Sequence, residues 1–87
     1  MEYKGKTFDT MGQVFDEALR LAKSKDSTEI KNFFNTYAEA CARDNHTSLD
    51  EGIIMAKRNL GYFAGYCNSD TIKLINETYN TSHPIFG

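Results

Sequence analysis

The chain has 87 residues, of which 40% are hydrophobic and 25% charged, with one proline and six glycines. This length and composition leave room for one folded domain over residues 1–87 with a small core. Ten basic residues against twelve acidic ones give a net charge of −2, which argues against binding to duplex nucleic acid. Because so short a chain buries only about 60–65% of its unfolded surface, a partner subunit or ligand would add stability.

The first eight residues carry Tyr3, Gly5 and Phe8 among lysines without a helical period, and we expect an extended arm there, with a short strand as an alternative. A helix is expected from Thr10, because the segment Thr10-Met11-Gly12-Gln13 has the form of a capping box. The apolar residues that follow recur at helical spacing up to Ala22, which indicates one buried face.

Three further start signals divide the rest of the chain. Asp26 precedes a second helix that is expected to end at 43–45. Ser48 precedes a third from about Leu49 to Cys67, with Leu49 on its inward stripe. Asn68-Ser69-Asp70 caps a fourth, shorter helix, expected over 71–79. The sequence therefore predicts an all-α fold, a small bundle of three to four helices with extended N- and C-terminal arms.

Cys41 and Cys67 each fall on the apolar stripe of an expected helix, so both are predicted to be buried free thiols. The chain begins without the apolar segment of a signal peptide, and its longest charge-free stretch, Asn59–Ser69, is too short to span a bilayer. We expect no membrane association and a cytoplasmic location.

The third helix departs from a plain surface helix at Gly61 and Gly65. Each glycine inside a helix costs about 1 kcal/mol relative to alanine. Lying four residues apart on one face, they would let another backbone or a flat ligand approach closely. Tight packing between helices is the alternative explanation.

Tyr62 and Tyr66 form a second four-residue ladder beside the glycines, and Lys57, Arg58 and Asn59 lie one turn before them. Tyrosine faces can stack on a nucleobase, and the two cations could meet phosphate. This surface is therefore predicted to be a ligand pocket or a subunit contact.

The terminal segment His83-Pro84-Ile85-Phe86-Gly87 cannot continue a helix, because proline lacks the amide hydrogen. One interpretation docks Ile85 and Phe86 across the bundle or a neighbouring subunit. The other places His83 at the rim of the tyrosine surface, with Phe86 helping to close the pocket.

Catalytic and metal-binding patterns are missing from the sequence. It contains no glycine-rich phosphate loop, no His-x-x-x-His and no paired-cysteine box. His46 and His83 are isolated from each other and from the cysteines. We therefore expect no enzyme, no metal site and no cofactor.

The segment 59–66, together with the terminal His-Pro-Ile-Phe-Gly, resembles a group of small bacteriophage and prophage proteins. These share a Gly-Tyr-x-Ala-Gly-Tyr helix and a His-Pro-(Ile/Val)-Phe-Gly terminus, and the resemblance covers about the last thirty residues. A phage origin implies a counter-defence role, as in the anti-CBASS and anti-Thoeris sponges that sequester nucleotide immune signals. Those sponges are typically small oligomers with aromatic and basic pockets near subunit contacts.

The resulting expectation is a non-enzymatic homo-oligomer that sequesters a small nucleotide-type ligand, such as a cyclic nucleotide or a cyclic ADP-ribose. Tyr62 and Tyr66 would stack on the base, Arg58 and Lys57 would contact phosphate, and Asn59 would read polar edges. The alternative is a protein–protein module that inhibits a host defence complex or acts as a phage adaptor.

Overall fold

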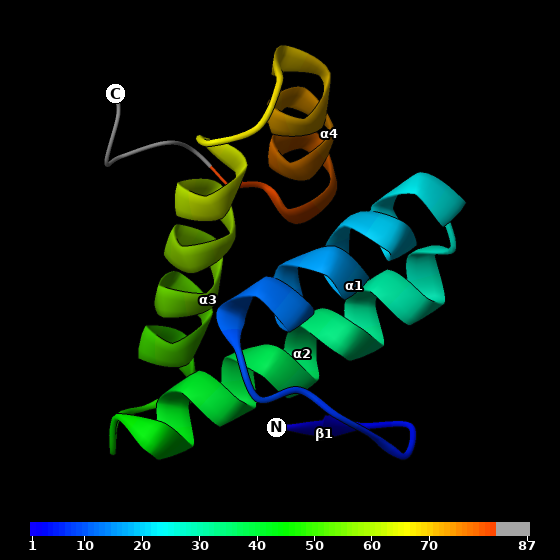
Figure 1. Cartoon of the computed structure of the whole chain (residues 1–87). Coiled ribbons are helices and arrows are strands. Elements are labelled where there is room, and N and C mark those ends of the chain that lie inside the picture. The colour runs from blue at the N-terminus through cyan, green and yellow to red at the C-terminus, as the bar shows by residue number, and fades with distance from the viewer. Residues whose placement is uncertain (82–87) are drawn as a thin grey trace.

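The computed structural model describes residues 1–81, and these form four helices with one small hairpin before them (Figure 1). The elements in chain order are β1 (Glu2–Tyr3), β2 (Lys6–Thr7), α1 (Met11–Ser24), α2 (Ser27–Asp44), α3 (Leu49–Ala64) and α4 (Ser69–Tyr79). The prediction of a small helical bundle is confirmed. The expected C-terminal arm lies outside the described residues.

Each helix begins at a polar side chain that accepts a hydrogen bond from a backbone amide of the first turn. Thr10 makes the full capping box, since its Oγ1 accepts from the Gln13 amide at 3.2 Å and the Gln13 Oε1 accepts from the Thr10 amide at 3.1 Å. Asp26, Ser48 and Asn68 each accept one such bond at the start of α2, α3 and α4. These local bonds satisfy amides that have no partner within the helix.

The N-terminal arm is an antiparallel hairpin in which Glu2 pairs with Thr7 and Tyr3 with Lys6. The two residues of its turn, Lys4 and Gly5, have φ angles of 51° and 78°. Left-handed backbone at both positions is the geometry that two-residue hairpins favour, and glycine adopts it without strain. The extended arm is thus folded back on itself.

Aromatic contacts hold this hairpin against α2. The ring of Phe33 lies 5.3 Å from the Tyr3 ring, edge to face, and 5.6 Å from the Phe8 ring. Phe8 and Phe33 are both buried. The hairpin is therefore packed as an extension of the core of the bundle and is not a flexible arm.

The helices α1 and α2 run side by side in opposite directions, while α3 crosses α2 steeply and α4 packs against α3 and α1 (Figure 1). Phe33, Leu60 and Ile75 are the largest fully buried side chains at the centre. The buried hydroxyl of Tyr79 donates to the Ala18 carbonyl oxygen at 2.6 Å. This bond ties α4 to the middle of α1.

A close helix contact lies where α3 crosses α2 at Gly52. A Cβ placed on Gly52 would lie 2.4 Å from the Ala38 carbonyl oxygen and 2.7 Å from the Ala42 Cβ. Two alanines four residues apart on α2 and one glycine on α3 thus allow the backbones to meet. The sequence analysis missed Gly52, although the Ala38/Ala42 spacing is a signal for such a contact.

The end of α3 differs from the prediction, because the helix stops at Ala64 and not at Cys67. The amides of Tyr66 and Cys67 donate to the carbonyls three residues earlier, at 3.1 and 2.9 Å. This tighter winding turns the backbone off the helical path. Cys67 is consequently exposed, and its predicted burial is wrong, whereas Cys41 is buried as expected.

Two smaller differences concern the ends of α3 and α4. Leu49, expected on the inward stripe, is half exposed because it occupies the first position of α3, beyond the crossing with α2. The fourth helix begins at Ser69, two residues before the predicted start, directly after its cap Asn68.

Candidate functional site

The four-residue spacing of Tyr62 and Tyr66 brings their rings into contact on α3. The ring centroids lie 5.3 Å apart with an interplanar angle of 68°, and the two hydroxyls are hydrogen-bonded at 2.9 Å. This bond raises the pKa of the Tyr66 phenol. Because the rings meet edge to face, a flat ligand would stack on one ring and meet the edge of the other.

The two tyrosines differ in exposure, with Tyr62 39% and Tyr66 72% accessible. Arg58 is exposed one turn before Tyr62 on the same face of α3, and Lys57 beside it is half-buried. Neither cation makes an ion pair with any residue in the range 1–81. An aromatic pair and a nearby cation therefore occur together, as a stacking site for a charged ligand requires.

The Asn59 side chain makes a hydrogen bond from α3 to α2. Its side-chain amide donates to the Tyr37 hydroxyl at 3.0 Å, and that hydroxyl donates to the Met11 sulfur at 3.0 Å. Burial raises the pKa of the Tyr37 phenol, which therefore stays protonated. Asn59 thus has a structural role between α3 and α2, and its role in contacting a ligand stays a prediction.

The remaining predicted residues are the two glycines of α3 and the two residues of the terminal segment. Gly61 is buried, and Gly65 is half-buried where its amide closes the last turn of α3 through bonds to Gly61 and Tyr62. A close backbone approach between helices occurs at Gly52, and close approach at Gly61 and Gly65 stays a prediction. His83 and Phe86 lie outside the described residues.

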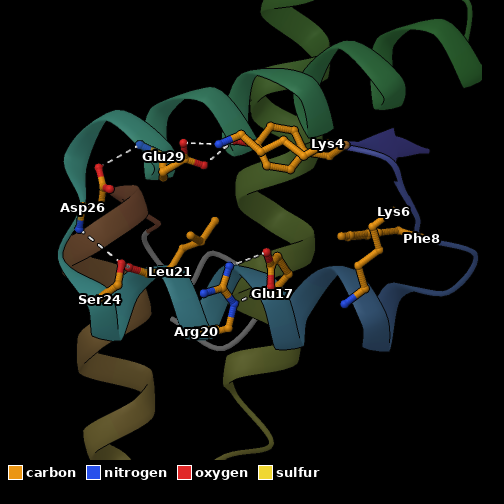
Figure 2. Close-up of a pocket in the computed structure, with 10 residues that line it drawn as sticks. Lys4, Lys6, Phe8, Glu17, Arg20, Leu21, Ser24, Asp26 and Glu29 are labelled. Atoms are coloured by element: carbon orange, nitrogen blue, oxygen red, sulfur yellow. Dashed lines mark hydrogen bonds and ion pairs between the residues drawn. The ribbon is translucent and has the colours of Figure 1, made fainter.

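A second candidate site is a cavity between the hairpin and the helices α1 and α2, and sequence reasoning missed it (Figure 2). We call this cavity of about 520 Å³ the hairpin trough. Its volume falls within the range of small-molecule sites, roughly 300–1,000 Å³. The residues that line it come from three separate segments: Tyr3, Lys4, Lys6, Phe8, Glu17, Arg20, Leu21, Ser24, Asp26 and Glu29.

Two carboxylates of the hairpin trough are already paired with cations. Glu29 accepts from Lys4 and, at 2.9 Å, from the Tyr3 hydroxyl, and these two bonds lower its pKa. Glu17 accepts two bonds from Arg20, both at 2.7 Å, and this pair lowers the pKa of Glu17. An anion that entered the trough would compete with these carboxylates.

Two trough cations face aromatic rings: the Nζ of Lys6 lies 5.2 Å from the centroid of Phe8, and that of Lys4 lies 5.8 Å from the centroid of Tyr3. Lys6 differs from Lys4 in its ion pairing. Within residues 1–81 it makes no ion pair. The buried side chains of Phe8 and Leu21 supply apolar surface between the charged groups. The trough can thus hold a flat apolar group with one anionic substituent near Lys6.

Cysteine reactivity and metal binding bear on two further predictions for the described part of the chain. Burial raises the pKa of the Cys41 thiol, which lowers the fraction of reactive thiolate. Among residues 1–81 no three His, Cys, Asp or Glu side chains lie close enough to hold a metal ion.

Comparison with known proteins adds no relative. The chain matches no protein-family model, and no curated protein or solved structure is significantly similar to it. Across residues 1–81, no helix has both the length and the apolar character needed to cross a membrane.

Proposed function

We propose that this protein is a non-enzymatic, phage-type binding protein that forms oligomers and sequesters a small nucleotide-derived immune signal. The observation that carries the proposal is the contact between the exposed rings of Tyr62 and Tyr66 beside Arg58. Base stacking on an aromatic side chain contributes about 1–3 kcal/mol per base. A neighbouring guanidinium adds charge-assisted hydrogen bonds to phosphate.

In this proposal each residue has a separate task. The accessible ring of Tyr66 carries the base, Tyr62 holds that ring through the 2.9 Å bond between the hydroxyls, and Arg58 with Lys57 binds phosphate. The resemblance of the segment 59–66 to phage proteins supports the anti-defence role. Host cytoplasm is the corresponding location.

Thermal unfolding against a panel of linear and cyclic nucleotides, including cyclic ADP-ribose isomers, tests the proposal. A ligand at one hundred times its Kd adds about 2.7 kcal/mol per site, which for so small a domain raises Tm by about 10 °C or more. We expect one nucleotide class to produce this shift. A flat panel refutes nucleotide binding and favours the protein–protein module, which a pull-down from host lysate would then identify.

Variants distinguish the tyrosine surface from the hairpin trough. Tyr66→Ala and Arg58→Ala should each abolish or strongly reduce the shift. The Tm of Tyr66→Ala without ligand should stay near that of the wild type, because the Tyr66 side chain is exposed. Lys6→Ala in the trough and Lys73→Ala on α4 are matched exposed controls and should keep the shift. If Lys6→Ala alone lost the shift, the ligand would bind in the hairpin trough and not at the tyrosine surface.

A further inference from the structure

The exposed face of α3 carries an apolar side chain flanked by opposite charges. Ile54 is 50% exposed, with Asp50 and Glu51 one turn before it and Lys57 and Arg58 one turn after it. Within residues 1–81 none of these four charged side chains forms an ion pair.

This charge pattern cannot neutralise itself within one helix. Side chains interact along a helix at three or four residues, whereas Asp50 and Arg58 are about 12 Å apart along the axis at 1.5 Å per residue. Acidic residues in a first turn are favoured by the helix dipole. Lys57 and Arg58 stand in the middle of α3, where the dipole gives no such preference.

We infer that α3 packs against α3 of a second copy of this chain, antiparallel, across a two-fold axis at Ile54. In this register Asp50 faces Arg58 of the partner subunit, Glu51 faces the partner's Lys57, and Ile54 meets its own counterpart. A two-fold interface requires such a self-complementary surface, in which every contact occurs twice. The position of Ile54 midway between the two charge pairs satisfies this requirement.

A second copy fits this face better than an unrelated partner, because one and the same helix supplies both halves of the charge pattern. A parallel arrangement would place Asp50 against Asp50 and Arg58 against Arg58, and like charges across an interface are unfavourable. The antiparallel arrangement also opposes the two helix dipoles. The charges therefore favour the antiparallel register in which the two-fold axis passes through Ile54.

The same axis brings the partner's α2–α3 connection, residues 45–48, towards Tyr62, eight residues beyond Ile54. His46 in that connection is exposed and has a φ of 53°. The tyrosine surface would then be completed by the partner subunit. This last step rests on the proposed function, whereas the association of α3 with α3 does not.

Sedimentation velocity without nucleotide, from micromolar to submillimolar protein, measures the association. We expect a concentration-dependent species of at least two chains for the wild type. Ile54→Asp and Arg58→Asp should each weaken association by about tenfold or more, because each introduces like charge or desolvated charge at the axis. Lys73→Asp, an exposed charge reversal on α4, is the matched control and should associate like the wild type.

A charge exchange tests the register itself. Asp50→Lys alone should weaken association as Arg58→Asp does, and the double variant Asp50→Lys/Arg58→Asp should restore it, since the pairs re-form with opposite sign. Circular dichroism and Tm confirm that each variant is folded. A wild type that stays monomeric at every concentration, an unaffected Ile54→Asp, or a double variant without rescue would each overturn the inference.

The two proposals can fail separately. Normal association and rescue without any nucleotide-induced shift would refute the ligand and leave the dimer. A nucleotide-induced shift in a protein that is monomeric throughout would refute the dimer and leave the ligand.

Discussion

Replacing Gly52 by alanine should destabilise the protein, although the same change in most helices is stabilising. Alanine is favoured over glycine in a helix by about 1 kcal/mol. At Gly52, however, the new methyl group would lie 2.4 Å from the carbonyl oxygen of Ala38, a backbone atom that no side-chain rotation can move away. The helices α2 and α3 must therefore separate locally.

The magnitude follows from two opposing effects. Overpacking of a tight contact costs about 1–3 kcal/mol, and the backbone obstacle places Gly52 at the upper end of that range. After the gain in helix propensity, we expect a net loss of about 2 kcal/mol. For a domain of this length each kcal/mol corresponds to about 4–8 °C in Tm, so Tm should fall by about 8–16 °C.

Gly12→Ala is the matched control. A Cβ on Gly12 would meet only the Thr10 Oγ1, at an ordinary 3.7 Å, so this variant should keep or raise Tm. Thermal and urea unfolding followed by circular dichroism would compare the two variants with the wild type. If Gly52→Ala raised Tm as Gly12→Ala is expected to do, the close crossing of α2 and α3 would be refuted.

Three further results are expected. Tyr79→Phe removes the 2.6 Å bond to the Ala18 carbonyl and should cost about 1 kcal/mol in urea unfolding; an unchanged midpoint would contradict the bond. Burial raises the pKa of both Tyr37 and Tyr79, so the folded state holds protons that the unfolded chain releases. The free energy of unfolding should thus keep its full value below about pH 10 and fall as the pH rises above it. Urea titrations in alkaline buffers measure this dependence, and a free energy that stays constant would contradict the burial of the two phenols. A thiol reagent should modify exposed Cys67 rapidly and buried Cys41 only on unfolding, and equal rates would show that Cys41 is accessible.

The starts of the helices were predictable because the signals are local. Thr10, Asp26, Ser48 and Asn68 each bond to an amide three residues later, so the sequence around each cap contains both partners. The end of α3 was not predictable in this way. Whether the amides of Tyr66 and Cys67 bond three or four residues back depends on packing, and periodicity alone extended the helix to Cys67.

The tyrosine contact was predictable from local spacing, whereas the hairpin trough depends on tertiary packing and was not. Tyr62 and Tyr66 meet because four residues make one helical turn, which the spacing reveals. The hairpin trough joins residues 3–8 to 17–29, and its walls exist only after the hairpin has folded against Phe33. Sequence spacing contains no information about that arrangement.

The bond between Tyr79 and Ala18 spans 61 residues, and it has a consequence for the order in which the protein is completed on the ribosome. The helices α1, α2 and α3 can each pack on the neighbour synthesised just before or after it, which favours rapid assembly. Tyr79 covers an apolar face of α1 and stacks on the ring of Phe34, with 5.8 Å between the ring centroids. Both surfaces stay uncovered until α4 is synthesised. A nascent chain that stalls before Asn68 would expose this face, and the chain would be a substrate for chaperones and proteases until α4 is synthesised.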